Sequence, residues 1–578
     1  MFIRLGLAYC YAVLPYLCLF SAFVFSSRNI RSLANKFFMS VVAGTAAFCV
    51  TASTITRFSF DLYQEVHVVL LFVGVFSIIS RKAKIFGTPH TLEINKHYVY
   101  ILILLVTAFL VRFVPSFLGN ESMGGDDARF HNILAQKILL ERTLSVDWTP
   151  FAPVNVIYPQ GSHVLTAFIA CIANCPVHYA FNFLIIVAGV LTAGMIYLIA
   201  DQIFHSSKCA FYAAASYAFL PYWGSLDYYR WGGLPNSIGM LFLCLLVLIV
   251  LGKAHSEQSK RNIAVIGSAL CVLAVYSVHH YSFLITIIFL VAGAIFTADT
   301  HYRRMLMAVA GLGILFCLPI LAPNYLASAV FRETASALIF REPFISISSA
   351  VNYLNPIFVT VFVLAILETM GSSFNAPQLL VLCWFTSMLA CFVFLEYLFR
   401  AGVLLVTHVT GFYTCLTPSR MLTNLVYPMS VLCGSIPLSD IWTRHKNTCI
   451  AIFFLFAITA CAVTWRNQVY TGVFPEEKEC AEWIKSNTPQ NSMIIGNLPH
   501  LEYLAWRETS NPPLPASERR NDPSVVWKKQ IQTYDEWLKW GGKNKRPVYF
   551  LLSANEAKPD LLKKVFSNSK VSIMVSAE

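Results

Sequence analysis

Charged side chains are scarce in this chain of 578 residues. Asp, Glu, Lys and Arg make up 12% of it, against about 25% in a soluble globular domain. Apolar residues make up 57% and gather in long runs such as 98–118, 179–200, 281–299 and 447–465. Each run is long enough to cross about 30 Å of hydrocarbon as a helix, so we predict a multi-pass α-helical membrane protein. The runs exclude a β-barrel, whose strands are short and alternating.

Other features that the sequence lacks exclude further classes of protein. The 16 cysteines form no Cys-x-x-Cys pair and lie almost all inside apolar runs, where cysteine behaves as a small hydrophobe. No internal repeat occurs. The net charge of +12 reflects Lys and Arg in short loops, so no basic domain remains to bind nucleic acid. The run from about residue 5 to 25 lacks a small-residue cleavage site, so we expect a retained span.

We expect about 14 membrane crossings from the lengths of the apolar runs. The expected helices lie near residues 5–25, 39–55, 66–80, 98–117, 179–200, 209–223, 235–252, 262–278, 281–299, 305–325, 351–369, 377–396, 421–440 and 447–465. A shorter stretch, 163–175, is expected to enter only the membrane edge. We divide the chain into N-terminal helices (1–97), a main transmembrane region (98–465) and a polar tail (466–578).

The charges of the loops predict which side of the membrane each loop faces. Lys and Arg cluster in alternate loops, for example near Arg28, Lys82, Lys260 and Arg303, and the positive-inside rule assigns these loops to the cytoplasm. The opposite, extracytoplasmic side then receives the loops 118–162, 224–234, 326–350 and 397–420, the turn 279–280 and the tail.

The tail changes composition and is predicted to be a small α/β domain. Residues 475–487 have the pattern of an amphipathic helix, and short strands are expected at 492–496, 547–553 and 570–575, with another helix near 555–566.

Four short polar stretches lie on the predicted outer side. They are Gly-Gly-Asp-Asp-Ala-Arg-Phe-His at 124–131, Tyr-Pro-Gln-Gly-Ser-His at 158–163, Asp-Tyr-Tyr-Arg-Trp-Gly-Gly-Leu-Pro-Asn at 227–236 and the pair His279-His280. Ionisable residues near hydrocarbon are costly and therefore indicate function. Because all four stretches share one side, we predict that they form a single active site.

The first stretch offers a carboxylate suited to general-base chemistry. Asp127 and His131 are four residues apart and share one face of a helix, and either Asp126 or Asp127 can take a proton from a hydroxyl. The alternative is a capped helix, with Asp126 as N-cap and acid in the first turn. A second alternative is a divalent metal such as Mg or Mn, held by Asp126, Asp127 and His131. The sequence signal for a metal is weak, because no His-x-x-x-His or His-Glu-x-x-His spacing occurs.

The other stretches each allow two interpretations. Tyr158 suits an aromatic belt, Pro159 and Gly161 suit a simple turn, and His163 is the residue that a turn does not explain. Candidate sugar- or acceptor-binding residues are Tyr158, Asp227, Arg230 and Trp231; the aromatic residues could equally be belt residues. His279 and His280 either bind a ligand or are structural residues at a helix junction.

Three arginines of the outer loops are candidate phosphate ligands: Arg332, Arg341 and Arg420. A guanidinium at the interface matches the geometry of a lipid-linked phosphate. The alternative is an arginine that only anchors its helix at the membrane surface.

In this order, the motifs resemble the GT-C superfamily of integral-membrane glycosyltransferases, in particular its uncharacterised bacterial and archaeal branch. The motifs of that branch match, in order, Gly125-x-Asp127-x-x-x-His131, Tyr158-Pro159-x-Gly161-x-His163, Trp231-Gly232-Gly233-x-Pro235, the His279-His280 pair and Arg420. The likeness covers about residues 98–578. Three helices precede the usual first one, and the Trp-Trp-Asp signature of oligosaccharyltransferases is absent, so transfer to asparagine is not favoured.

The resemblance implies a polyprenyl-phosphate-linked sugar donor at the outer face and an acceptor hydroxyl on a glycan, lipid or protein. Asp127 would be the base, with Asp126 as its helper, and inversion is expected. Donor and phosphate ligands would be Arg420 with Arg332 or Arg341, and His163, His279 and His280. No cofactor would be required. The lipid tail of the donor would lie in a groove between helices, and membrane lipids would surround the protein. The active site and the C-terminal domain would be on the extracytoplasmic side of the cytoplasmic membrane.

Three other functions compete with this one. A non-catalytic membrane scaffold whose tail binds partners would leave the acidic pair Asp126-Asp127 unexplained. A polysaccharide polymerase or O-antigen-type ligase uses the same side and the same class of donor. A transporter or flippase of lipid-linked sugar would place its ionisable groups near the bilayer midplane on broken helices, often in repeated halves. The polar stretches lie instead at one interface.

Overall fold

The computed structural model describes part of the chain, and the structural statements below concern these residues. They are 1–25, 33–57, 64–82, 96–117, 126–144, 158–226, 228, 232–327, 345–370, 375–394, 396, 418–438, single positions between 444 and 465, 474–496, 501–505, 508–510, 538–539, 543, 547–553 and 562–576.

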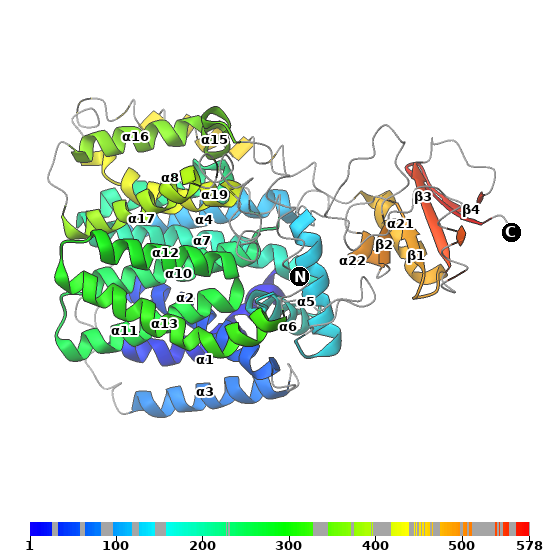
Figure 1. The fold of residues 1–578 in the computed structure, drawn as a ribbon, viewed down its shortest axis with the longest axis horizontal. Helices are drawn as coiled ribbons and strands as arrows, with labels where there is room; N and C mark the ends of the chain where they lie inside the picture. Colours follow the sequence, from blue (N-terminus) through cyan, green and yellow to red (C-terminus); the bar gives the residue numbers. More distant parts are fainter. Residues whose placement is uncertain are drawn as a thin grey trace.

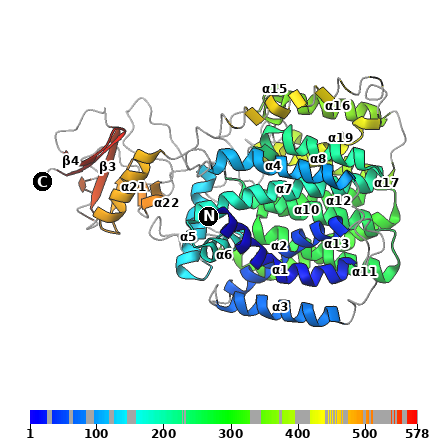
Figure 2. The ribbon, with the colours of Figure 1, turned by 180° about the vertical axis from the view of Figure 1, so that it is seen from behind.

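The helices of the membrane region run side by side in one bundle (Figures 1 and 2). Their bounds are α1 (Phe2–Phe25), α2 (Leu33–Arg57), α3 (Gln64–Lys82), α4 (Lys96–Phe117), α7 (Val177–Phe204), α8 (Ser207–Phe219), α10 (Leu234–Lys253), α11 (Gln258–Val278), α12 (His280–Phe296), α13 (Thr300–Ala327), α15 (Ile347–Leu354), α16 (Pro356–Met370), α17 (Ala376–Val393) and α19 (Pro418–Cys433).

The chain is an integral membrane protein with a multi-pass helical fold, as predicted. Within the described residues, six helices are long and apolar enough to cross a membrane, or seven if the bent pair α15–α16 counts as one span. Six shorter apolar helices accompany them. The larger expected number, about 14 crossings, stays a prediction, because several of the expected segments are only partly described.

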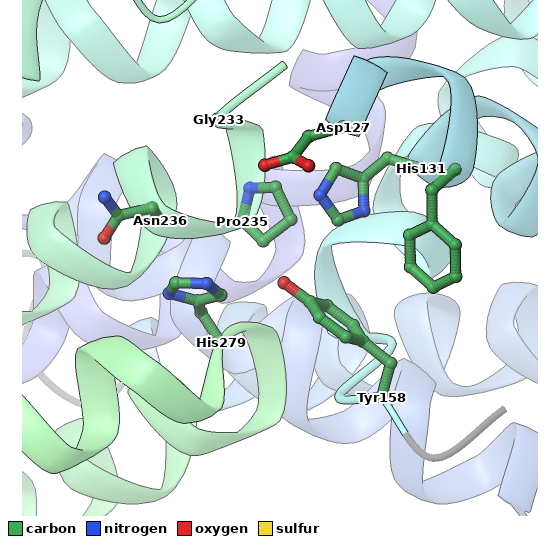
Figure 3. Close-up of a pocket in the computed structure, with 8 residues that line it drawn as sticks. Asp127, His131, Tyr158, Gly233, Pro235, Asn236 and His279 are labelled. Atoms are coloured by element: carbon green, nitrogen blue, oxygen red, sulfur yellow. The ribbon is translucent and has the colours of Figure 1, made fainter. Parts of the chain in front are cut away.

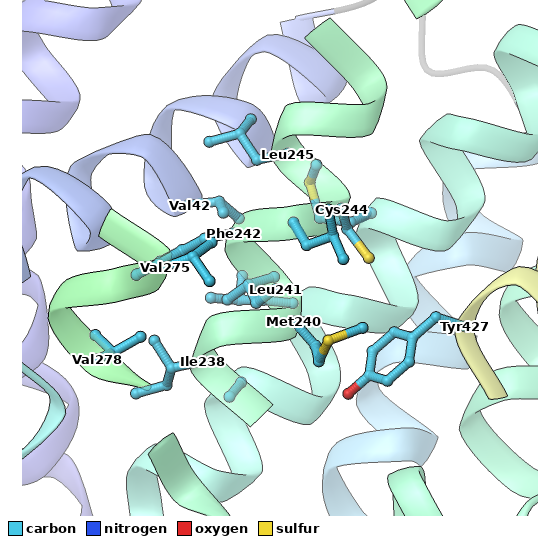
Figure 4. Close-up of a cluster of buried hydrophobic side chains, with 14 of the residues drawn as sticks. Val42, Ile238, Met240, Leu241, Phe242, Cys244, Leu245, Val275, Val278 and Tyr427 are labelled. Atoms are coloured by element: carbon cyan, nitrogen blue, oxygen red, sulfur yellow. The ribbon is translucent and has the colours of Figure 1, made fainter. Parts of the chain in front are cut away.

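The centre of the bundle is formed by α7 and α10. Both are apolar around their whole circumference and buried along most of their length, which requires other helices on every side. α10 packs against α2, α7, α11 and α12. The buried cluster in Figure 4 includes Val42, Ile238, Met240, Leu241, Phe242, Cys244, Leu245, Val275, Val278 and Tyr427.

The N-terminal helices are part of this bundle. α1 packs on α2, α3 and α6 (Gly161–Ala173), and α2 packs on α10 and α11. Described helices on either side of residue 97 therefore pack together, and the division at this residue stays a prediction.

Two segments differ from the expected pattern. The expected loop 118–162 contains a helix, α5 (Asp126–Glu141). The single helix expected over 351–369 is instead α15 and α16, bent by 95°. Asn355 interrupts it with φ of 81°, and its side-chain amide donates to the Leu220 carbonyl at 2.6 Å. The next residue is Pro356, which disfavours helical conformation in the residue before it.

The tail forms a small α/β domain, as predicted. Its sheet has the order β2-β1-β3-β5-β4, with strands β1 (Met493–Ile495), β2 (Glu508–Ser510), β3 (Val548–Ser553), β4 (Leu562–Ser567) and β5 (Val571–Ser576). β1 pairs in parallel with β2 and β3, and β3, β5 and β4 pair antiparallel. Helix α21 (Pro475–Asn487) packs near β4 and β5.

The helix expected near 555–566 is wrong over its last part, because residues 562–566 belong to strand β4. The following Asn568 side chain accepts from the backbone N–H groups of Lys570 and Val571. This closes a turn that pairs β4 with β5. Pairing with a neighbouring strand thus overrides the local helical pattern.

The tail domain contacts the end of the bundle where α5 and α6 lie (Figures 1 and 2). Its helix α22 (Leu501–Ala505) packs on α5. The Tyr503 hydroxyl lies 3.2 Å from His178 Nδ1 and accepts from the His178 backbone N–H at 3.3 Å. Both side chains are buried, so this contact fixes the tail domain against the bundle.

Candidate functional site

A cavity of about 100 Å³ lies at the tail-domain end of the bundle. Each of the four polar stretches contributes to its wall (Figure 3). The lining residues are Asp127, Phe130, His131, Tyr158, Gly233, Pro235, Asn236 and His279. The structure thus brings together stretches that lie up to about 150 residues apart in the sequence.

Helix α5 supplies Asp127 and His131, which both line the cavity. They are one helical turn apart, so their side chains leave the same face. Asp127 lies in the first turn of α5, where the unpaired N–H groups and the helix dipole favour a negative charge. Asp126 is the first residue of α5, and its side chain lies outside the described part.

The Gly-Gly turn before α10 holds the start of α5 in place. Gly232 has φ of 79°, a conformation that glycine adopts without cost. A Cβ atom at this position would lie 2.2 Å from the backbone nitrogen of Ala128. Only glycine therefore lets the turn approach the backbone immediately after Asp127.

His131 is backed by His163, the third residue of α6. His131 Nδ1 lies 2.9 Å from His163 Nε2, and the His163 ring also hydrogen-bonds the Pro159 carbonyl. His163 is 1% exposed. With 13 residues, α6 is too short to cross a membrane. Burial lowers the pKa of His163 from 6.5 to about 3, so the ring is neutral at physiological pH.

Tyr158 lies at the centre of a group of histidine rings. Its ring centroid is 5.4 Å from that of His131, 5.5 Å from His163, 6.2 Å from His279 and 5.1 Å from His280. These are the spacings of packed aromatic rings. The structure therefore unites in one cluster the four histidines that the sequence analysis selected.

The histidine pair forms the junction of α11 and α12. α11 ends at Val278 and α12 begins at His280, so His279 alone joins them. Its Nδ1 accepts the backbone N–H of Ser282 at 3.3 Å. The Ser282 hydroxyl in turn lies 2.8 Å from Asn236 Oδ1.

The sequence analysis did not select Phe130, Asn236 or Ser282. Asn236 closes the third polar stretch, directly after Pro235, and its position there was the available signal. Ser282 lies three residues after a helix-capping residue, where an N-cap side chain finds its backbone partner. No local pattern indicates that Ser282 contacts α10.

Several predicted site residues cannot be placed relative to the cavity. Asp227, Arg230, Trp231, Arg332 and Arg341 lie outside the described residues. Arg420 is the third residue of α19, and its side chain is likewise not described.

The helix that carries Arg420 packs against the third polar stretch. α19 lies against η1 (Tyr222–Leu226), and the hydroxyl of its Tyr427 lies 2.6 Å from that of Tyr228. In the described part of the chain, no group of three His, Cys, Asp or Glu side chains is placed to hold a metal ion. The suggested set with Asp126 is not tested by this, because that side chain is not described.

A buried arginine supports the start of the third stretch. Arg112 on α4 is 1% exposed. Its guanidinium donates to the Ala218 carbonyl at 3.2 Å and to the Ser225 hydroxyl of η1 at 2.8 Å. Arg112 therefore joins α4 to the segment that leads into residues 227–236.

No protein-family model and no curated protein matches this sequence. Solved membrane proteins with a similar structure include the following three. The archaeal oligosaccharyltransferase AglB from Archaeoglobus fulgidus, in complex with an inhibitory peptide and a dolichol-phosphate, has a TM-score of 0.54 at 13% identity. The match covers 79% of this chain and 69% of AglB.

ArnT from Cupriavidus metallidurans, bound to undecaprenyl phosphate, also has a TM-score of 0.54 at 13% identity, over 82% of this chain and 97% of ArnT. The arabinofuranosyltransferase AftD from mycobacteria has a TM-score of 0.50 at 14% identity, over 83% of this chain and 40% of AftD. At these identities the likeness concerns the fold. The chain has the fold of the GT-C membrane glycosyltransferases.

Proposed function

We propose that this protein is a membrane glycosyltransferase that moves a sugar from a polyprenyl-phosphate-linked donor to an acceptor hydroxyl. The observation that carries the proposal is the single cavity that combines Asp127 and His131 with residues of the three other polar stretches. A fold alone does not define a reaction. The cavity adds a carboxylate, several ring nitrogens and an aromatic side chain at the same point.

Asp127 acts as the general base. It removes the proton of the acceptor hydroxyl while that oxygen attacks the anomeric carbon of the sugar. The bond from the anomeric carbon to the phosphate oxygen breaks, and its electron pair leaves with the lipid phosphate. Attack from the face opposite the leaving group inverts the anomeric carbon. Asp126 assists this proton transfer. His131 is fixed by its contact with His163 and lies on the same face of α5 as Asp127.

A lipid monophosphate fits the fold as leaving group. Two of the similar proteins were solved with lipid phosphates, dolichol-phosphate in AglB and undecaprenyl phosphate in ArnT. We assign Arg420, with Arg332 or Arg341, to the phosphate, because a bidentate guanidinium stabilises the developing charge. Tyr158, Asp227, Arg230 and Trp231 are assigned to the sugar or acceptor. The lipid tail of the donor lies in a groove between helices.

The distribution of charge supports an extracytoplasmic site. α10 begins at the cavity and, with 20 residues, ends about 30 Å away. Near that far end, Arg261 contacts His301 and His255 pairs with Asp299 at 3.1 Å, and Lys253, Arg303 and other basic residues lie nearby in sequence. Basic loops face the cytoplasm, so the cavity and the tail domain face the other side.

Transfer assays with Asp127→Asn test the proposal. The full chain in nanodiscs is given radiolabelled polyprenyl-phosphate hexoses and pentoses, with membranes from a deletion strain as acceptor. General-base catalysis contributes about 100- to 10,000-fold to a reaction rate. The variant should therefore transfer sugar at least about 100-fold more slowly, and it should still bind undecaprenyl phosphate. Glu141→Gln is the matched control: it removes a carboxylate from the other end of α5, paired with Lys137. Normal transfer by Asp127→Asn would exclude Asp127 as the base.

A further inference from the structure

The side chain of Asn236 is buried at the wall of the cavity. Asn236 is the third residue of α10 and lines the cavity, yet it is only 1% exposed. The Ser282 hydroxyl donates to its Oδ1 at 2.8 Å. The amide nitrogen, Nδ2, has no hydrogen-bond partner among the residues that the structure describes. Such a buried group is rare, because it has lost water without a replacement. The fold alone therefore does not account for this side chain.

Contacts with α12 hold the amide in place. Ser282 is fully buried, and its hydroxyl also lies 2.9 Å from His279 Nδ1. Gly239, three residues further along α10, lets the two helices approach, because a Cβ atom there would lie 2.7 Å from the Ser282 side chain. The amide of Asn236 is thus fixed before a ligand binds, as in sites that select one polar group of a ligand.

The chemistry of an amide matches a hydroxyl group better than a phosphate. Asn236 is neutral, and a lipid phosphate is bound most strongly by charged donors such as the arginines assigned to it. If the amide plane were turned by half a turn, Oδ1 would take the place of Nδ2, because the Ser282 hydroxyl can pair with either atom. A hydroxyl group donates and accepts, so it pairs with whichever amide atom faces it, whereas an ionised phosphate oxygen only accepts.

The position of Asn236 separates it from the acceptor. Figure 3 shows Asn236 on one side of Pro235 and His131 on the other, with Asp127 beside His131. In the proposed reaction the acceptor oxygen lies at Asp127 and attacks the anomeric carbon from the face opposite the phosphate. The sugar ring lies between these two groups. A hydroxyl group that reaches Asn236 from within the cavity is accordingly one of the donor sugar.

We propose that Asn236 binds a hydroxyl group of the donor sugar and so helps to determine which sugar the protein transfers. The identification of this group as a sugar hydroxyl rests on the proposed function. A buried amide that hydrogen-bonds a substrate hydroxyl rejects a sugar without that group, because the amide is then left without a partner. Asn236 adds to the residues that the motifs selected for the sugar or acceptor, which are Tyr158, Asp227, Arg230 and Trp231.

The test compares lipids with and without a sugar. Native mass spectrometry of the full chain released from nanodiscs measures the binding of undecaprenyl phosphate and of undecaprenyl-phosphate-linked glucose, mannose and arabinose. The sugar preference is the affinity for the best of these three divided by the affinity for undecaprenyl phosphate. The wild type should prefer at least one sugar-bearing lipid, and a wild type with no preference would refute the sugar-binding site.

Asn236→Leu replaces the amide by an apolar group of the same branched shape. The sugar preference should fall about tenfold, because one hydrogen bond is lost. The affinity for undecaprenyl phosphate and the melting temperature should stay close to those of the wild type. Asn236→Ala is the second variant, in case the larger leucine does not fit. A folded variant with the wild-type sugar preference overturns the proposal, and so does an equal loss of affinity for both kinds of lipid.

Ser237→Ala is the matched control in the same turn of α10. Ser237 is fully buried, and its hydroxyl likewise has no hydrogen-bond partner within the described residues. It is not one of the residues that line the cavity, so its replacement should leave the sugar preference unchanged. A loss equal to that of Asn236→Leu would show that any change in this turn disturbs binding, and would overturn the proposal.

Donor analogues separate the contact from the reaction. Monodeoxy analogues of the preferred sugar, each linked to undecaprenyl phosphate, are compared with the parent sugar. One analogue should bind the wild type about tenfold more weakly, whereas the Asn236 variant should bind this analogue and the parent equally. The same ratio in both proteins for every analogue would refute the contact. Binding needs no acceptor, so a wild type that shows this pattern without transferring sugar would refute only the proposed reaction.

Discussion

Replacing Gly232 by alanine tests whether the Gly-Gly turn sets the position of the base. Gly232 has φ of 79° and lies against the first turn of α5. The added Cβ would be 2.2 Å from the backbone nitrogen of Ala128 and 2.5 Å from its Cα. Ala128 is fully buried and directly follows Asp127. The substitution therefore acts on the backbone that carries the proposed base, while every side chain lining the cavity is retained.

The size of the effect follows from this geometry. Ordinary contact begins near 3.4 Å, so α5 and the turn must separate by about 1 Å. A misplacement of about 1 Å near a reacting group costs about 100-fold in rate. The positive φ adds about 1–2 kcal/mol of strain for alanine. We expect Gly232→Ala to lose about 100-fold in kcat while unfolding only a few degrees earlier.

Gly252→Ala is the matched control, in the last turn of α10, the helix that follows the Gly-Gly turn. No atom lies within 4 Å of the Cβ that would be added there, and alanine in a helix is favoured over glycine by about 0.4–1 kcal/mol. It should transfer sugar at the normal rate and melt at an equal or slightly higher temperature. Both variants are compared for kcat in the nanodisc transfer assay and for thermal unfolding. A Gly232→Ala protein with normal kcat would refute the idea that this contact positions Asp127.

Three other predictions concern contacts around the cavity. The folded state holds His163 neutral down to about pH 3, whereas the unfolded ring takes up a proton below pH 6.5, so stability should fall by about 1.4 kcal/mol per unit as the pH drops from 6.5 toward 3; His163→Phe should flatten that part of the melting profile, and an unchanged slope would contradict the assignment. Arg112→Lys keeps the charge but loses the guanidinium hydrogen bonds to Ala218 of α8 and Ser225 of η1, and should destabilise the protein by about 1–3 kcal/mol in thermal unfolding; an unchanged melting temperature would show that these bonds are unimportant. Tyr503→Phe should weaken docking of the tail domain on the bundle by about 1 kcal/mol, so that a protease releases the tail faster. Tyr549→Phe on β3 should leave the release rate unchanged; equal release rates for the two variants would contradict a stabilising role of the Tyr503–His178 contact.

The meeting of the four polar stretches could be predicted from the sequence, for a simple geometric reason. Each stretch lies where an apolar run begins or ends, and counting runs puts all of them at the same end of a bundle. Helices of about 20 residues have only two ends. The cavity lined by Asp127, Tyr158, Asn236 and His279 is what that count leads one to expect.

The partners within the cavity could not be predicted in this way. His131 and His163 are 32 residues apart, and Asn236 and Ser282 are 46 residues apart. No periodicity relates such positions, because their contacts depend on how α5, α6, α10 and α12 pack. His163 was assigned to donor binding from its motif. In the structure it is buried behind His131, which favours a positioning role, although that role too remains a proposal.

The position of the polar groups along the helices bears on the competing transporter. A transporter holds its substrate near the bilayer midplane on interrupted helices, whereas here the cavity lies where α5 and α10 begin and α11 ends. Even the buried Arg112 lies only five residues before the end of α4, and its partner Ser225 follows the end of α8. The broken pair α15–α16 contributes no residue to the cavity wall. α10, which links the cavity to the opposite end, is apolar and buried along nearly all its length. A site confined to one end of the bundle suits a reaction at the membrane surface, because that is where the phosphate of a lipid-linked donor lies.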